Sequence, residues 1–176
     1  MENEGRVRET KAKWEGKVSV CLKGATAEQV WPLLEDFFNL HKVFPTLATC
    51  YGVEGVSGKS GCVRYCAGFS IPSTGGDGDM PVTVSWSKER LVAIDPSEWT
   101  MSYEMIDSNI GFTSYLSTIR VFPGNIGNGS TKIEWSFVVD PVEGWKLEDL
   151  ISKYESGLQR MAERIDDTIS QSTPAF

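Results

Sequence analysis

Three polar side chains, Arg64, Glu89 and Tyr115, stand in segments that are otherwise rich in apolar residues. Desolvation in an apolar cavity pushes a carboxylate toward its neutral form, whereas an adjacent guanidinium pulls it back, so such a pair can hold a base available near neutral pH. An arginine presents several donors to an oxyanion and a tyrosine adds one neutral donor. Together these groups would orient one small oxygen-bearing group, with Glu89 as the proton shuttle.

The elements that must position these residues follow from hydrophobic periodicity. Residues 14–23 alternate as a half-buried strand does. Thr26 stands three residues before Gln29, the spacing of a capping box, and two short helices follow it. The chain from residue 46 to 141 then has the texture of a β-meander. Its predicted strands cover residues 47–56, 61–69, 82–94, 98–107, 112–122 and 130–140.

The alternation of the strands does not by itself turn all three polar residues to one side. Arg64 shares its side of the strand with two cysteines, which is compatible with an internal position. The apolar parity set by Val84 and Trp86, however, points Glu89 outward. Only a bulge near Ser87 would shift the register and turn the carboxylate inward. An inward Arg–Glu pair would also be compatible with a purely structural internal ion pair.

The last predicted element is an amphipathic helix over residues 146–169, whose apolar stripe needs a large partner. The concave face of the meander is the partner on offer, and Gly157 suits a close approach between the two. A curved sheet closed by one helix tends to leave an internal cavity. The candidate substrate-binding residues of its wall are Met101, Tyr103, Met105, Phe112, Trp135 and Phe137.

Composition excludes several classes of protein. The 17 basic and 24 acidic residues give a formal charge of −7, which disfavours nucleic-acid binding and a polybasic membrane anchor. The chain contains no apolar run long enough for a membrane span and no zinc-ligand spacing, so we expect no membrane insertion and no metal. Cys62 and Cys66 lie too far apart along one strand to form a disulfide. No obligate protein partner is expected.

The domain organisation is predicted to be simple. Residues 1–13 form a charged flexible tail without the apolar segment of a secretory signal, so the expected location is cytoplasmic. Residues 14–170 form one domain, and residues 171–176 form a C-terminal tail. The glycine-rich loop at 73–79 has the character of a mobile lid.

The order of elements and several short motifs resemble the Bet v 1, START and polyketide-cyclase superfamily (SRPBCC), and within it the plant lachrymatory-factor synthases. The resemblance implies an α+β helix-grip fold, in which a seven-stranded curved antiparallel sheet wraps around a long C-terminal helix and two short helices. The motifs are spread over residues 14–170, and they are Trp14-Glu15-Gly16-Lys17-Val18, Leu40-His41-Lys42-Val43, Gly61-Cys62-Val63-Arg64-Tyr65, Lys88-Glu89-Arg90-Leu91-Val92-Ala93, Met101-Ser102-Tyr103 and Trp135-Ser136-Phe137.

The same resemblance implies a chemistry. In the synthases an Arg, a Glu and a Tyr in the cavity isomerise an alkenyl sulfenic acid to a thial S-oxide without a cofactor, and the matching positions are Arg64, Glu89 and Tyr115. The sequence departs from the synthase pattern at Met105 and Phe112, which predicts a reshaped pocket wall. The alternative is a non-enzymatic carrier or sensor of a small hydrophobic or lipid-like ligand. In either case the expected partner is a small hydrophobic or sulfur-containing metabolite.

Overall fold

A computed structural model describes residues 12–70, 84–124 and 130–172 of the chain. The order of elements confirms the predicted strand, two short helices, six strands and terminal helix. In chain order they are β1 (Trp14–Cys21), α1 (Ala27–Glu35), the 3₁₀ helix η1 (Phe37–Lys42), β2 (Thr49–Glu54), β3 (Val63–Ser70), β4 (Val84–Asp95), β5 (Thr100–Ser108), β6 (Leu116–Phe122), β7 (Lys132–Val139) and α2 (Leu147–Ser172).

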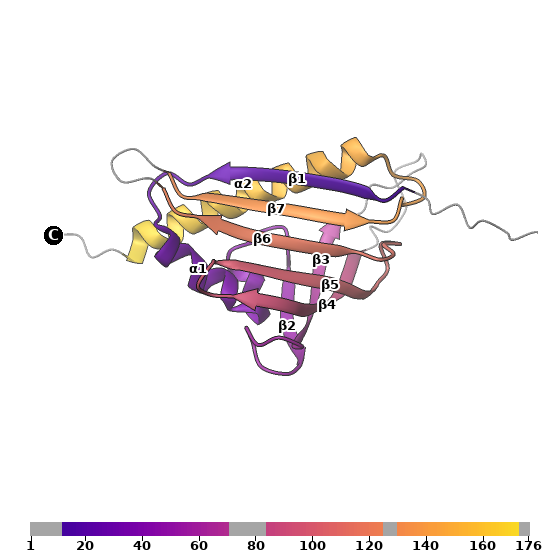
Figure 1. Cartoon of the computed structure of the whole chain (residues 1–176), viewed down its shortest axis with the longest axis horizontal. Helices are drawn as coiled ribbons and strands as arrows, with labels where there is room; N and C mark the ends of the chain where they lie inside the picture. Colours follow the sequence, from indigo (N-terminus) through magenta and orange to yellow (C-terminus); the bar gives the residue numbers. More distant parts are fainter. Residues whose placement is uncertain (1–11, 71–83, 125–129, 173–176) are drawn as a thin grey trace, which may run out of the picture.

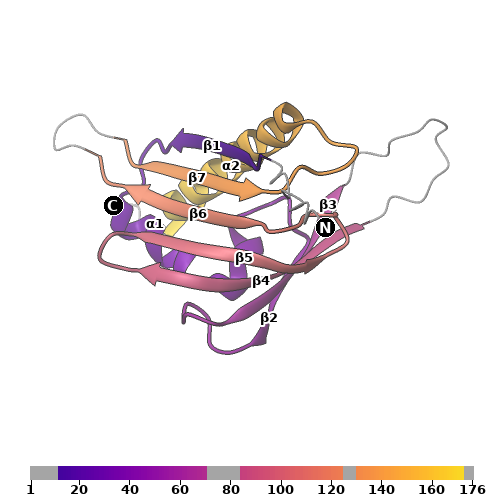
Figure 2. The same cartoon turned by 45° about the vertical axis from the view of Figure 1, so that its right-hand side comes forward.

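The seven strands form one antiparallel sheet in the order β1-β7-β6-β5-β4-β3-β2. Figure 1 shows β2 and β3 running across the direction of the other strands, so the sheet is strongly curved. The helix α2 lies along the inner side of this sheet, and α1 and η1 cover its other end, as the turned view in Figure 2 also shows. The arrangement is the expected α+β helix-grip fold.

Hydrogen bonds fix the loop between β1 and α1. The predicted capping box is present, because the Thr26 side chain accepts from the Gln29 backbone and the Gln29 side chain accepts from the Thr26 backbone. Asp166 of α2 accepts hydrogen bonds from the backbone N–H of Lys23 at 2.9 Å and of Gly24 at 3.3 Å. These bonds fix the C-terminal part of α2 to the loop between β1 and α1.

At Gly157 the helix α2 packs closely against Phe44. A Cβ atom at this position would lie 3.0 Å from Cζ of Phe44. Contacts that short are rare for a real Cβ, so the glycine permits the packing that the sequence indicated. The neighbouring residues on the same face of α2 are buried, and among them are Leu150, Leu158, Met161, Ala162 and Ile165.

The inner face of β4 is the polar one, so the outward orientation predicted for Glu89 from apolar parity is wrong. From Val84 to Val92 the strand alternates without interruption, and its buried residues are Ser85, Ser87, Glu89 and Leu91. No bulge in β4 near Ser87 is needed, since the register irregularity beside Glu89 skips Ile106 of β5. On the outer face Trp86 stacks on Tyr65 with ring centroids 6.1 Å apart, whereas Val84 is exposed.

Two element boundaries differ from the predictions by more than two residues. β6 begins at Leu116 and not at residue 112, because Ser114 adopts a left-handed backbone conformation with φ of 55° that a strand cannot contain. The helix α2 extends to Ser172, beyond the predicted end of the domain at residue 170. The predicted lid at 73–79, and most of the tails predicted at 1–13 and 171–176, lie outside the described residues.

Candidate functional site

A cavity of about 390 Å³ lies between the curved sheet and α2. Most of its wall is aromatic or aliphatic, with residues contributed by η1, the inner strand faces and α2. Its polar groups include the Arg64–Glu89 pair on β3 and β4 and the hydroxyl pair of Tyr115 and Tyr154 of α2. Further polar side chains in the wall are Thr46, Ser85, Lys153, Ser156 and Arg160. An apolar pocket with a few convergent polar groups is the usual form of a small-molecule site.

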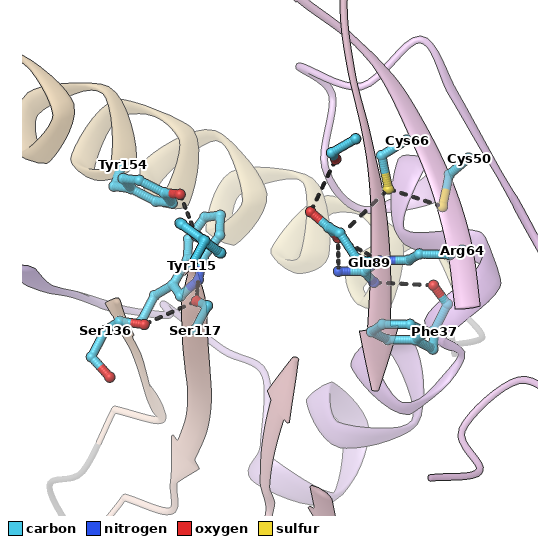
Figure 3. A network of polar contacts seen from close by, with 11 residues as sticks. Phe37, Cys50, Arg64, Cys66, Glu89, Tyr115, Ser117, Ser136 and Tyr154 are labelled. Carbon is cyan, nitrogen blue, oxygen red and sulfur yellow. Dashed lines mark hydrogen bonds and ion pairs between the residues drawn. The ribbon is translucent and has the colours of Figure 1, made fainter. Parts of the chain in front are cut away.

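Arg64 and Glu89 form a buried ion pair. Their side chains are 3% and 8% exposed, and both Nε and Nη2 of Arg64 donate to Glu89 Oε1 at 2.8 Å. The remaining guanidinium nitrogen, Nη1, donates to the backbone carbonyl of Phe37 at 3.0 Å. The guanidinium carbon also lies 3.7 Å from the centroid of the Phe37 ring, so the cation is held on two sides (Figure 3).

Strand pairing is what brings the pair together. Arg64 and Glu89 are direct neighbours in the β3–β4 register and point to the same side of the sheet. Burial by itself lowers the pKa of Arg64, but the negative charge of Glu89 and its neighbours outweighs burial, and the pKa of Arg64 is raised. The guanidinium therefore stays charged at every physiological pH and is a permanent partner for the carboxylate.

Glu89 keeps one oxygen available for further chemistry. Oε1 takes both bonds from Arg64, while Oε2 accepts a hydrogen bond from the Ser87 hydroxyl at 3.2 Å. A carboxylate oxygen has two lone pairs, so Oε2 can accept a second donor from a molecule in the cavity.

Tyr115 lines the same cavity but does not contact the ion pair. Its hydroxyl pairs with the hydroxyl of Tyr154, and Figure 3 shows this cluster apart from the one around Glu89. Burial raises the pKa of both phenols well above the ordinary tyrosine value, so both remain neutral donors. Beside them Ser117 accepts from the Trp135 indole N–H and donates to the Ser136 carbonyl. The predicted trio thus shares one cavity but not one hydrogen-bond network.

Four of the six candidate wall residues line the cavity, namely Tyr103, Met105, Phe112 and Trp135. Met101 and Phe137 are buried in the core and lie outside this lining. Phe137 packs on Tyr154 with ring centroids 4.7 Å apart and so supports the tyrosine pair. Neither side chain is part of the cavity lining, so a contact of Met101 or Phe137 with a ligand stays a prediction.

The sequence analysis missed four residues around the polar groups: Cys50, Cys66, Ser87 and Tyr154. Cys66 lies 3.8 Å from Glu89 Oε1 and 3.7 Å from the sulfur of Cys50. The signal for Cys66 was available, because it shares the parity of Arg64 in β3. Tyr154 has the spacing of the apolar stripe of α2, and nothing local indicates that its hydroxyl meets a residue 39 positions away.

No group of three or more His, Cys, Asp or Glu side chains in the described parts of the chain is arranged to hold a metal ion. Within residues 12–70, 84–124 and 130–172, no helix has the length and apolar character needed to cross a bilayer.

Comparison with known families agrees with this geometry. The family model described as polyketide cyclase/dehydrase and lipid transport matches residues 13–166. The chain belongs to this family. Members of this SRPBCC family are associated with small hydrophobic ligands, in accord with a large apolar cavity that carries few polar groups.

Solved structures support the fold of this polyketide-cyclase family member. The major latex-like protein 151 of Panax ginseng is 18% identical with a TM-score of 0.66, and the alignment covers 92% of this chain and 99% of that one. The protein XoxI of Bacillus cereus is 23% identical with a TM-score of 0.64, covering 91% and 99%. An uncharacterised Bacillus thuringiensis protein is 27% identical with a TM-score of 0.63, covering 86% and 98%.

Proposed function

We propose that the cavity binds a small, mostly apolar molecule with one acidic O–H group and isomerises it by a proton shuttle on Glu89. The substrate class favoured by the resemblance of the sequence is an alkenyl sulfenic acid, and the product is a thial S-oxide. The observation that carries the proposal is the ion pair of Arg64 and Glu89, because it sets a carboxyl group with one available oxygen into a mostly apolar wall.

The reaction needs no net change of protons or electrons. Glu89 Oε2 takes the proton of the S–O–H group, a sulfur lone pair of the resulting sulfenate forms the C=S bond, and the alkene π electrons move to the far alkene carbon. The same carboxyl group then returns the proton to the far alkene carbon. Arg64 holds Oε1 in place throughout and offsets the negative charge on Glu89 after the proton has been returned.

The tyrosine pair supplies orientation at a second polar position in the wall. Tyr115 and Tyr154 share one hydrogen bond between two hydroxyls, so one of the two phenolic protons is not used in that bond. A neutral donor there can bind the substrate oxygen without competing for the proton that Glu89 carries. In this scheme Tyr115 orients the substrate, Glu89 moves the proton and Arg64 fixes the carboxylate.

The experiment that tests the proposal is turnover of an alkenyl sulfenic acid generated in the assay, with the thial S-oxide measured by mass spectrometry. Glu89→Gln keeps the size of the side chain and a hydrogen-bonding oxygen but removes the base. We expect product formation to fall by at least about 100-fold, the usual contribution of a positioned general base. Binding of an apolar fluorescent probe in the cavity should be retained.

The chain offers a matched control. Glu104 of β5 pairs with Arg90 of β4 at 2.9 Å across neighbouring strands, as Glu89 does with Arg64, but these side chains are 45% and 40% exposed for Arg90 and Glu104. Glu104→Gln should leave turnover unchanged. Wild-type protein that binds the probe but forms no thial S-oxide would refute the isomerase proposal as stated.

The second candidate function is a carrier or sensor of a hydrophobic ligand. The feature that favours it is the wall itself, since aromatic and aliphatic side chains dominate a cavity of about 390 Å³. For a carrier, Glu89→Gln would change ligand affinity only modestly, and neither the wild type nor the variant would consume the ligand. The same pair of measurements therefore distinguishes the two functions.

A further inference from the structure

Two cysteines beneath the cavity form a pair that the proposed isomerisation does not use. Cys50 of β2 and Cys66 of β3 are direct neighbours in the antiparallel register, and their sulfur atoms lie 3.7 Å apart. Directly opposite residues of antiparallel strands have Cα atoms about 4.5–5.5 Å apart, which falls within the range that a disulfide can bridge. Figure 3 shows the two sulfurs facing one another beside Glu89 and Arg64.

The surroundings of the pair give its two members different protonation. The pKa of Cys50 is lowered to about 6, mainly by the hydrogen bond from Cys66. Burial raises this pKa, whereas the positive charge of Arg64 lowers it further. The pKa of Cys66 is raised, first by its hydrogen bond to Cys50 and then by burial and the charge of Glu89. A pKa of about 6 favours the thiolate of Cys50 at neutral pH, and Cys66 keeps the thiol proton that it donates to Cys50. A reacting and a resolving cysteine require this combination.

The pair adjoins the cavity, because Cys66 lines it and Cys50 lies next to Cys66 with 7% of its surface exposed. Among the described cysteines, Cys62 is also buried, but burial raises its pKa, and no sulfur contact is found for it. Cys62 directly precedes β3 and provides an internal comparison.

We propose that Cys50 and Cys66 are a redox-active dithiol that a small hydroperoxide oxidises to a disulfide. The Cys50 thiolate attacks the terminal peroxide oxygen, the O–O bond breaks, and hydroxide or alkoxide leaves, so that Cys50 becomes a sulfenic acid. The sulfur of Cys66 then attacks the sulfur of Cys50, its thiol proton leaves with the hydroxyl group as water, and the disulfide forms. The peroxide gains the two electrons that the two thiols lose.

The disulfide would act directly on the carboxylate of the cavity. The single thiol proton of Cys66 has two acceptors within reach, the Cys50 sulfur at 3.7 Å and Glu89 Oε1 at 3.8 Å, and the disulfide has no such proton. Oxidation therefore removes one donor from the surroundings of Glu89. The dithiol does not depend on Glu89 being a base, and it would exist in a carrier as well as in an enzyme.

The test is to treat the native full-length protein with hydrogen peroxide, denature it, alkylate the remaining thiols and map the peptides without a reductant. We expect a Cys50–Cys66 cross-linked peptide, a chain mass lower by two hydrogens, an alkylated Cys62 and full reversal by dithiothreitol. Cys66→Ser should stop the reaction at a sulfenic acid on Cys50, which dimedone traps, whereas Cys62→Ser should leave the cross-link unchanged. Circular dichroism of each variant verifies folding.

The wild-type map decides the proposal even if a variant does not fold. Four alkylated cysteines after peroxide treatment would overturn it. So would a disulfide between two chains through the exposed Cys21, or oxidation of Cys62 at the same rate as Cys50. None of these results bears on turnover of the sulfenic acid, so a failure here is distinguishable from a failure of the isomerase proposal.

Discussion

Replacing Arg64 by methionine tests whether the pair with Glu89 is a desolvated ion pair, on which the site depends. The substitution keeps most of the apolar stem but removes both bonds to Glu89 Oε1 and the bond to the Phe37 carbonyl. It therefore leaves a buried carboxylate without its counter-charge and a backbone carbonyl without its donor.

The magnitude follows from the burial of the pair. Breaking a buried pair from one side typically costs about 3–5 kcal/mol, whereas an exposed pair contributes about 0–1 kcal/mol. Arg64 and Glu89 are 3% and 8% exposed in their side chains, so the first range applies to Arg64→Met. Arg90→Met removes the half-exposed pair with Glu104 and should cost no more than about 1 kcal/mol.

Equilibrium unfolding in urea, followed by circular dichroism at neutral pH, measures both variants. A double variant, Arg64→Met with Glu89→Met, should recover most of the lost stability, because it removes both charges from the interior. If Arg64→Met and Arg90→Met lose the same small free energy of unfolding, the inner pair is not desolvated. Glu89 would then be an ordinary solvated carboxylate, and the site would lack the desolvated base on which the proposed reaction depends.

Three further outcomes are expected. Gly157→Leu should reduce binding of an apolar probe at least about tenfold in a titration, because its side chain must enter the cavity past Phe44; unchanged binding would show that ligands sit elsewhere. The rate of alkylation of Cys50 by iodoacetamide should rise with pH through about 6 and level off above it, because only the thiolate reacts and the hydrogen bond from Cys66 lowers the pKa of Cys50. A rate that rises only near the ordinary pKa of a cysteine thiol would contradict this. Tyr115→Phe and Tyr154→Phe should each lower the free energy of unfolding by about 0.5–1.5 kcal/mol, and the double variant by less than their sum, because they break one shared hydrogen bond; strict additivity would mean that the hydroxyls do not interact.

The sequence by itself determined the order of the elements and most of the core. The alternation in β7 and the apolar stripe of α2 are local patterns, and each forces one face toward a common interior whatever the rest of the chain does. The capping box at Thr26 was also predictable, because it depends only on residues within one turn of the helix. The close packing at Gly157 was predictable because it depends on the absence of a side chain at that position.

Only the tertiary structure decided how the polar groups meet. Glu89 faces inward although Val84 and Trp86 of the same strand face outward, since Arg64 on the adjacent strand compensates its charge and Trp86 has an aromatic partner outside. Tyr115 pairs with Tyr154 from the far end of the chain rather than with the ion pair. Periodicity reports which face of a strand a residue occupies, but compensation of a buried polar group depends on partners that distant segments bring to it.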